Sequence, residues 1–314
     1  MRAYAIGRLP AGPIAFPLRT VMPMSAAEEA WSIGRLLQWT TDYLRRHQVE
    51  SPRLDAEVLL AEAVGCKRIE LYTRFDEVPG ESVRQKFREF VRQRAQGRPV
   101  AYLIGHREFF SLDFTVSDAV LIPRPETEFV VVALRDRAQA AARPSPLVAD
   151  VGTGSGVLAV CAARYLPGSR VVACDTSRDA LAVAAANAQR HGVADRIRFF
   201  QSDLLADVPA DEPFDFIVSN PPYVSEAEYE RLPADVRLHE PRAALLSGPQ
   251  GTEVIERLAA EAVERLRPGG WLLVEISPMI HQAVTAVFSP PQWQLGETVM
   301  DLARLPRVVQ AMKV

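Results

Sequence analysis

Residues 150–156 read Asp-Val-Gly-Thr-Gly-Ser-Gly, a glycine-rich stretch that indicates an α/β fold. The apolar run Leu147–Val151 predicts a buried strand, and Val157–Tyr165 after it predicts a helix. A glycine loop between a strand and a helix lets the backbone approach a ligand closely. A dinucleotide-binding fingerprint would need a third glycine at Val157, so the spacing here is GxGxG instead. The loop therefore suits a nucleoside with a short charged tail better than a pyrophosphate.

Strand and helix patterns alternate along the chain from about residue 126. Beyond the glycine loop, the predicted strands are 170–174, 197–201, 214–219 and 271–276, and the predicted helices are 177–190 and 252–266. Buried strands that alternate with helices form a parallel, doubly wound α/β sheet. Ligands of such sheets bind beyond the carboxyl ends of the strands, so the loops that follow the strands are where we look for a site.

Residues from about 28 to 98 predict helices only. Apolar side chains recur at helical spacing between 33 and 44, and Ser51-Pro52 has the sequence of a helix start, an N-cap residue before a proline. Gly65 fits the left-handed position that ends a helix. We therefore expect a small all-helical domain before the sheet.

A third helix of this domain, predicted over 81–96, is strongly basic. Its basic residues, with one that follows, are Arg84, Lys86, Arg88, Arg92, Arg94 and Arg98. These charges fit a solvated helix face, and they also fit a docking surface for an acidic or RNA-bearing partner.

Two segments flank the helical domain. Residues 1–27 hold three arginines, four prolines and no acid, so we expect a disordered extension. Residues 99–125 predict a short hairpin with its turn at 111–113, followed by prolines at 123 and 125, and we interpret this stretch as a linker.

The composition is typical of a globular protein and disfavours several other classes. The chain has 314 residues, 48% hydrophobic and 24% charged, with a formal net charge of −3. This predicts roughly two globular domains, and it disfavours a disordered chain or a mainly electrostatic binder of nucleic acid. The sequence holds no apolar run of about 18 residues, so we expect no membrane span.

Cysteine and histidine give no sign of a metal site. The cysteines Cys66, Cys161 and Cys174 form no CxxC pair, and the five histidines share no metal-ligand spacing. We expect buried free thiols, no bound metal and a monomeric protein in the reducing cytoplasm.

Two aspartates follow the next predicted strands. Asp175 lies 19 residues beyond Gly156, where a carboxylate can accept both ribose hydroxyls of a nucleoside; capping the next helix is the alternative, although Ser177 can fill that role. Asp203 and Leu204 could contact the amine and ring face of an adenine, and a turn is an equally good interpretation of the aspartate.

The tetrad Asn220-Pro221-Pro222-Tyr223 follows the strand 214–219. A rigid turn is the simple interpretation of such a sequence. However, proline has no N–H, so this loop offers mostly acceptors. The Asn220 side-chain oxygen and the Pro221 carbonyl can take both protons of a planar NH2 group, while Tyr223 packs on its flat face.

Such a loop can activate a poor nucleophile. The lone pair of an amide or aniline-like nitrogen is delocalised, and two acceptors polarise the nitrogen and favour the cation that forms when it attacks a methyl group. The methyl donor that this chemistry implies is a sulfonium, S-adenosylmethionine.

Together, the glycine loop, Asp175 and the tetrad resemble the class I methyltransferases that act on planar amines. More specifically, the chain resembles the HemK-type N5-glutamine methyltransferases of peptide chain release factors. Three more stretches support this resemblance, which covers about 28–314: Ser-Pro-Arg-Leu-Asp-Ala-Glu at 51–57, Ile-Pro-Arg-Pro-Glu-Thr-Glu at 122–128 and Glu-Pro-Arg-Ala-Ala-Leu at 240–245.

The resemblance implies a domain plan and a substrate. It implies an extension at 1–27, a helical substrate-docking domain at 28–98, a hairpin linker at 99–125 and a seven-stranded S-adenosylmethionine-dependent methyltransferase domain at 126–314. The substrate it implies is the glutamine of the Gly-Gly-Gln loop in release factors.

The resemblance also assigns residues. It implies that the cofactor contacts Gly152, Thr153, Gly154, Ser155, Gly156, Asp175, Asp203, Leu204 and Asn220. The substrate amide is implied to lie against Asn220, Pro221, Pro222 and Tyr223, with Asn220, Pro221 and Tyr223 catalytic. For Arg124 and Glu126, an ion pair between domains and a role in ordering the substrate loop or cofactor entrance remain equal alternatives.

A second class of substrate shares the tetrad. An exocyclic base amine is also planar, so a nucleic-acid methyltransferase is the alternative function. A duplex binder needs a basic cleft and often a recognition insert, whereas this chain is net acidic and its extra domain is small and helical.

Overall fold

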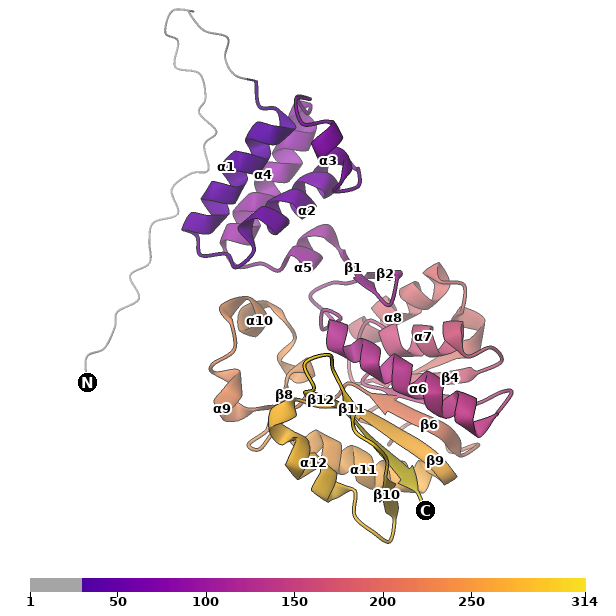
Figure 1. The fold of residues 1–314 in the computed structure, drawn as a ribbon. Helices are drawn as coiled ribbons and strands as arrows, with labels where there is room; N and C mark the ends of the chain where they lie inside the picture. Colours follow the sequence, from indigo (N-terminus) through magenta and orange to yellow (C-terminus); the bar gives the residue numbers. More distant parts are fainter. Residues whose placement is uncertain (1–29) are drawn as a thin grey trace, which may run out of the picture. The chain divides into compact units, whose positions relative to one another are not determined.

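The computed structural model describes residues 30–314, so the extension predicted at 1–27 lies outside the described residues. The chain divides into two compact units, the first ending at Ile104 and the second beginning at Gly105. Figure 1 shows the first as a group of helices and the second as a sheet with helices. The predicted boundary at 98 thus falls six residues before the division in the structure.

The first unit is helical, as predicted. Its helices are α1 (Ile33–Arg46), α2 (Pro52–Val64), α3 (Glu70–Thr73), α4 (Glu81–Ala95) and α5 (Val100–Ile104). Their apolar faces form one core, which includes Leu36, Leu37, Leu59, Leu60 and Phe87.

Two predictions about where the helices of this unit begin were wrong. Gly65 ends α2 with φ of 76°, as expected, but the Ser51 side chain makes no capping hydrogen bond. Helix α5 lies where we predicted the linker to begin. The Pro99 carbonyl accepts from the N–H groups of Tyr102 and Leu103, so this helix begins directly after Pro99.

The basic residues of α4 are mostly paired with acids of the same unit. The ion pairs are Arg84–Glu81, Lys86–Glu62, Arg88–Glu81, Arg92–Glu89 and the well-buried Arg94–Asp55. These contacts favour the solvated-face interpretation of the charge run over a free basic docking surface.

The second unit starts with the predicted hairpin, formed by β1 (His106–Phe109) and β2 (Leu112–Thr115). Its turn is at Phe110 and Ser111, with φ of 49° and 60°, so the predicted turn at 111–113 was placed slightly too late. Two left-handed residues in a two-residue turn match the twist of the paired strands.

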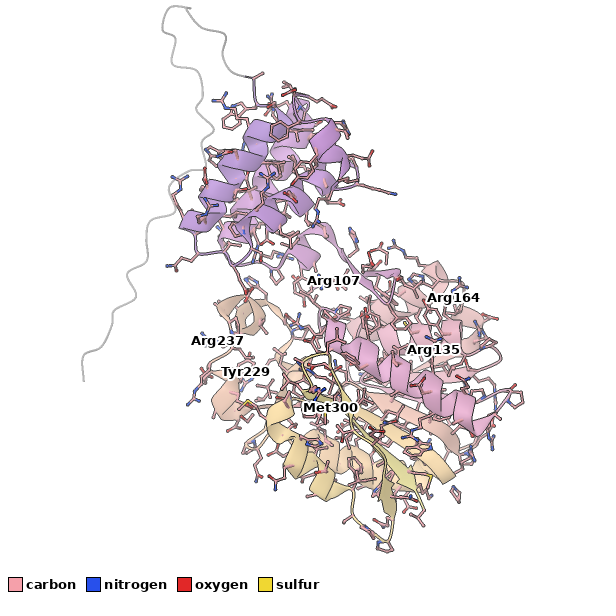
Figure 2. All side chains as sticks on the ribbon, viewed as in Figure 1. Arg107, Arg135, Arg164, Tyr229, Arg237 and Met300 are labelled. Atoms are coloured by element: carbon pink, nitrogen blue, oxygen red, sulfur yellow. The ribbon has the colours of Figure 1, made fainter. Side chains whose placement is uncertain are left out.

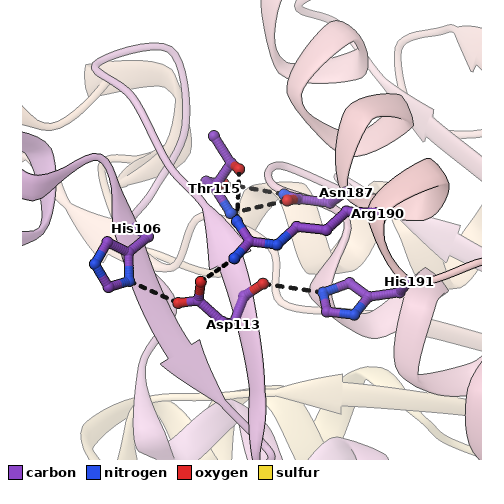
Figure 3. Close-up of polar contacts among 6 residues, drawn as sticks. All are labelled: His106, Asp113, Thr115, Asn187, Arg190 and His191. Atoms are coloured by element: carbon purple, nitrogen blue, oxygen red, sulfur yellow. Dashed lines mark hydrogen bonds and ion pairs between the residues drawn. The ribbon is translucent and has the colours of Figure 1, made fainter. Parts of the chain in front are cut away.

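The hairpin is fastened to α8 (Arg178–Arg190) by polar contacts (Figure 3). Asn187 accepts from the Thr115 N–H at 2.8 Å and donates to the Thr115 carbonyl at 3.0 Å. Arg190 pairs with Asp113, which also binds the His106 ring at 2.6 Å. The hairpin is therefore part of the sheet unit rather than a free linker.

The sheet has the predicted doubly wound form. Strand order is β10-β12-β9-β6-β3-β4-β5, seven strands, with the two-residue β11 (Val299–Met300) paired to β12 as an eighth. The parallel strands are β3 (Leu147–Val151), β4 (Arg170–Asp175), β5 (Ile197–Gln201), β6 (Phe214–Ser219) and β9 (Leu266–Glu275). The fold class predicted from the sequence is confirmed.

Helices cover both faces of this sheet. One core packs beneath α6 (Glu128–Ala141), α7 (Val157–Tyr165) and α8, and the other beneath α11 (Glu253–Arg265) and α12 (His281–Val287). The antiparallel strands β10 (Trp293–Leu295) and β12 (Pro306–Lys313) close one edge and were not predicted.

A segment of short elements follows the tetrad. It contains β7 (Val224–Ser225), α9 (Glu226–Tyr229), α10 (Ala234–His239) and β8 (Leu246–Gly248). Figure 2 shows Tyr229 and Arg237 on this segment, where the Tyr229 hydroxyl lies 3.3 Å from the Arg237 carbonyl. In residues 30–314, no helix is long and apolar enough to cross a membrane. All three cysteines are free, and Cys66 is only partly buried, contrary to our expectation.

Candidate active site

A pocket of about 360 Å³ opens at the carboxyl ends of the parallel strands. Its volume is in the range of small-molecule sites. Nine of the predicted site residues line it: Gly152, Thr153, Gly154, Ser155, Asp175, Asp203, Leu204, Asn220 and Pro222. Gly156, Pro221 and Tyr223 are not among the residues that line it.

The glycine loop needs its glycines for two different reasons. Gly152 and Gly154 have φ of 72° and 54°, and the space beside each is open, which leaves the backbone bare toward the pocket. Gly156 has φ of 82°, and a Cβ there would lie 3.0 Å from the Ala184 side chain. Gly156 therefore allows the loop to pack closely on α8.

Asp175 holds the glycine loop in place. Its Oδ2 accepts from the Gly154 N–H and its Oδ1 from the Ser177 N–H, both at 2.9 Å. Ser177 caps α8 by accepting from Ala180, so the capping role falls to Ser177 as we anticipated. Each carboxylate oxygen has a second lone pair, so Asp175 can also accept hydrogen bonds from hydroxyl groups of a ligand in the pocket.

Asp150 is buried beneath the same loop. Its Oδ2 accepts from the Thr153 hydroxyl at 2.6 Å and the Ala159 N–H at 2.9 Å. Its Oδ1 has no hydrogen-bond partner within the described part of the chain. Burial raises the pKa of Asp150 to about 7. This oxygen can receive a donor from a bound ligand.

Asn187 was missed by the sequence analysis. It is fully buried on α8, and in addition to Thr115 its NH2 group donates to the Ser155 carbonyl at 2.8 Å. One side chain therefore joins the hairpin to the glycine loop. The available signal was a polar residue on the apolar face that Ala184 and Ala188 share, since a buried amide must find partners.

The side of the pocket formed by Asp203 and Leu204 is exposed to solvent. Asp203 pairs with Arg257 at 2.6 Å, and both side chains are more than half exposed. Leu204 has φ of 52°, which is unusual for a residue other than glycine, and its carbonyl accepts from the Cys174 thiol. Such a left-handed residue beside a pocket is typical of a functional loop.

The tetrad is held from behind by side chains distant in sequence. The Asn220 amide nitrogen donates to the Thr127 hydroxyl oxygen at 3.0 Å, and the Tyr223 hydroxyl lies 3.3 Å from Glu275 Oε1. Burial raises the pKa of Tyr223, so the phenol stays protonated. Gly251 lies over the loop, where a Cβ would be 2.7 Å from the Tyr223 carbonyl.

The 122–128 motif is fastened to the segment after the tetrad. Arg124 donates to Glu240 at 2.6 Å, and Glu240 is 6% exposed. Neighbours of both residues, including Pro123 and Pro241, line the pocket. Arg124 thus makes its ion pair within the second unit, and this favours the role in ordering the pocket entrance. Among residues 30–314, no cluster of potential metal ligands is present.

Comparison with known proteins agrees with this geometry. A family model described as the PrmC N-terminal domain matches residues 35–105, and one described as the methyltransferase small domain matches residues 127–249. A protein of Rhodopirellula baltica named release factor glutamine methyltransferase is 52% identical over 261 residues, which cover 82% of this chain and 88% of that protein. The chain belongs to the release factor glutamine methyltransferase family.

Another member of the family is similar over almost its whole length. The release factor glutamine methyltransferase of Geobacter sulfurreducens is 40% identical over 287 residues, covering 91% of this chain and 98% of the relative. The chain is therefore a methyltransferase, and the family resemblance predicted from its motifs is confirmed.

One solved structure shows how far the fold extends beyond the family. The hMettl16 catalytic domain in complex with the MAT2A 3′UTR hairpin 6 aligns with a TM-score of 0.50 and 17% identity, covering 71% of this chain and 81% of that one. At this identity the likeness concerns the fold alone. The choice of substrate must come from the family and from the site.

Proposed function

We propose that this methyltransferase transfers the methyl group of S-adenosylmethionine to the side-chain amide nitrogen, N5, of the glutamine in the Gly-Gly-Gln loop of peptide chain release factors. The observation that carries the proposal is the orientation of Asn220. Its nitrogen is bound by Thr127, and the residue lines the pocket, so its oxygen is the atom left to accept from a substrate. The relatives are named for this class of substrate.

The residues of the pocket fit the cofactor. The bare backbone at Gly152 and Gly154 admits the amino acid portion, the unpartnered Asp150 Oδ1 can accept a donor from it, and Asp175 can accept the ribose hydroxyls. Asp203 and Leu204 lie at the open side, which suits an adenine. When bound, S-adenosylmethionine supplies an electrophilic methyl group on a sulfonium.

The tetrad prepares the nucleophile. Asn220 Oδ1 and the Pro221 carbonyl accept the two N–H groups of the glutamine amide, and Pro222 and Tyr223 complete the slot. Both acceptors hold the nitrogen in line with the methyl group and stabilise the positive charge that develops on it. The N–CH3 bond forms as the S–CH3 bond breaks, and the methylated nitrogen then releases one proton to water.

The direct test uses labelled S-adenosylmethionine with an intact release factor, followed by peptide mass mapping. We expect one methyl group on the glutamine of the Gly-Gly-Gln loop, and no label when that glutamine is replaced by alanine. Label in RNA or DNA, with none in the factor, would favour the alternative of an exocyclic-amine methyltransferase. We also propose that the enzyme works as a monomer in the cytoplasm, where release factors act.

We further propose that the helical unit docks the protein substrate. Because the basic side chains of α4 are mostly paired within the unit, the exposed apolar residues of the unit are the better candidates: Leu54, Ile69, Tyr72, Phe75 and Val78. Ile69→Glu should raise the KM for the release factor severalfold and leave cofactor affinity unchanged. Arg92→Gln is the matched control, since Arg92 already pairs with Glu89. Equal KM values for the two variants would contradict docking at this surface.

A further inference from the structure

Two neighbouring segments at the carboxyl edge of the sheet expose large apolar side chains. One is the 3-10 helix Pro278–Ile280 after β9, where Met279 is 80% exposed, and the other is the loop between β11 and β12, where Leu302 is fully exposed. Met300 and Leu305, at the two ends of this loop, are also exposed. We call Met279, Met300, Leu302 and Leu305 the apolar edge surface. Single exposed apolar residues are common, but several in adjoining segments mark a surface that binds another molecule.

Hydrogen bonds join these two segments. The Ile276 N–H donates to the Arg307 carbonyl at 2.9 Å, and the His281 ring nitrogen Nε2 lies 3.1 Å from the Thr298 hydroxyl oxygen. The two contacts lie on either side of Met279 along one segment and on either side of the loop along the other. Strand β12 runs antiparallel to β9, so its first residues lie at the edge of the sheet where the pocket opens.

The loop between β11 and β12 is held in one conformation by Asp301. Its Oδ1 accepts from the N–H groups of Ala303 and Leu305 at 2.8 and 2.9 Å, and its Oδ2 pairs with Arg307 at 2.8 Å. A loop that is already ordered loses little conformational entropy when it binds a partner. The position of Leu302 on this loop therefore suits docking, because a fully exposed side chain contributes nothing to the core.

The same loop is linked to the tetrad side of the pocket. The Arg307 guanidinium also lies 3.7 Å from the carboxylate of Glu126, in the 3-10 helix that precedes α6. The next residue, Thr127, lines the pocket and accepts from Asn220. Figure 1 shows the loop between β11 and β12 beside the beginning of α6, and Figure 2 labels Met300 there. The apolar edge surface thus adjoins the part of the pocket that would receive the substrate amide.

We propose that the apolar edge surface docks the release factor beside its Gly-Gly-Gln loop. This inference rests on the proposed function: a glutamine that enters the pocket belongs to a folded protein, and the surface of that protein around the loop must cover the enzyme beside the pocket. The four side chains carry no charge, so they gain from burial against an apolar face of the partner. A small free amine would leave them exposed.

The test is steady-state methylation of an intact release factor, with binding of the factor to the enzyme measured directly in the presence of S-adenosylhomocysteine. Leu302→Glu changes a fully exposed loop residue, so the variant should fold like the wild type. We expect the KM and Kd for the release factor to rise about tenfold, the usual cost of losing one central interface side chain. Both kcat at saturating factor and cofactor affinity should stay unchanged. Met279→Glu, on the other segment, should act in the same direction.

Two control variants separate docking from general effects. Leu302→Met keeps an apolar side chain and should keep the wild-type KM. Leu295→Glu is the matched control, because Leu295 is also exposed but lies on β10, which pairs with the end of β12 away from the loop. Its KM for the release factor should equal that of the wild type.

The outcomes distinguish this inference from the proposed function. A wild-type KM in Leu302→Glu, or an equal rise in Leu295→Glu, would overturn docking at the apolar edge surface. A change of oligomeric state in Leu302→Glu, seen by light scattering without a change in KM, would assign the surface to a second copy of this chain and also overturn it. If the wild-type enzyme itself leaves the release factor unmethylated, the proposed function fails instead.

Discussion

The two halves of the pocket are built by different means. In the cofactor half, formed by the loops after β3, β4 and β5, Asp150 and Asp175 bind backbone N–H groups 9 and 21 residues away. In the tetrad half, Asn220 reaches Thr127 across 93 residues and Tyr223 reaches Glu275 across 52. A ligand can thus be held by local backbone geometry, whereas orienting one amide oxygen depends on side chains that only the fold brings together.

The largest effect should come from Asn220→Ala, which removes the acceptor of the tetrad half. Loss of one preorganised group of this kind typically lowers turnover by about 10²–10³. Cofactor affinity should change far less, because most contacts to the cofactor lie in the other half. Single-turnover methylation of a release factor, with cofactor titration, measures both.

Asn220→Asp refines that result. The aspartate keeps an acceptor oxygen and loses the N–H groups that bind Thr127, so we expect an impaired but active enzyme. Near-normal turnover in Asn220→Ala would instead leave Asn220 as a turn residue, and the two halves would no longer differ in function.

Asn187→Ala tests whether the cofactor half also depends on a long-range contact. It leaves the Thr115 N–H, the Thr115 carbonyl and the Ser155 carbonyl without their partner. We expect a loss of about 2–3 kcal/mol in the free energy of unfolding, measured with urea. Arg190→Gln breaks an exposed ion pair with Asp113 and a long hydrogen bond to the Thr115 hydroxyl of the same hairpin, and it should cost less than about 1 kcal/mol. Equal stability of the two variants would show that Asn187 does not hold the hairpin and loop together.

The sequence predicted the features that depend on local patterns better than those that depend on contacts between distant segments. Leu147–Val151, Val157–Tyr165, Ile197–Gln201 and Phe214–Ser219 were predicted with the bounds that the structure has, because apolar runs between turn residues encode buried strands and helices locally. The glycine loop and Asp175 were placed in the pocket for the same reason.

What could not be predicted depends on tertiary contact. Thr127 lies in the 122–128 motif, but nothing local pairs it with Asn220, and Asn187 looks like any helix residue until the hairpin packs on it. Strand β12 was missed because its pairing with β9 joins the last residues of the chain to 271–275, and periodicity does not reveal such a partner.

Asp175→Ala should lower the affinity for S-adenosylmethionine, and this effect should be smaller than the loss of turnover in Asn220→Ala. It removes the acceptor for the Gly154 N–H and for the ribose, and a charge-assisted hydrogen bond is worth about 1.5–3 kcal/mol, so affinity should fall more than tenfold. Calorimetric titration of S-adenosylmethionine measures this. Unchanged affinity in a folded variant would remove Asp175 from the site and leave it as a support of the loop.

The smallest effect that we expect is a change in the pH dependence of stability. It distinguishes the contribution of Glu275, in the tetrad half, from that of Asp150, in the cofactor half. Burial raises the pKa of Glu275 from 4.5 to about 7, so the unfolded chain releases this proton at lower pH than the folded one does. Stability from this group is therefore full below about pH 4.5 and is lost as the pH rises toward 7. Between about pH 6 and pH 8 the wild type should lose about 1 kcal/mol through Glu275, and Glu275→Gln should not. Asp150 is shifted in the same direction by the same cause and remains in both proteins, so only the difference between their urea-unfolding curves isolates Glu275. Parallel pH dependence in the two proteins would mean that Glu275 is ionised as readily in the folded chain as in water.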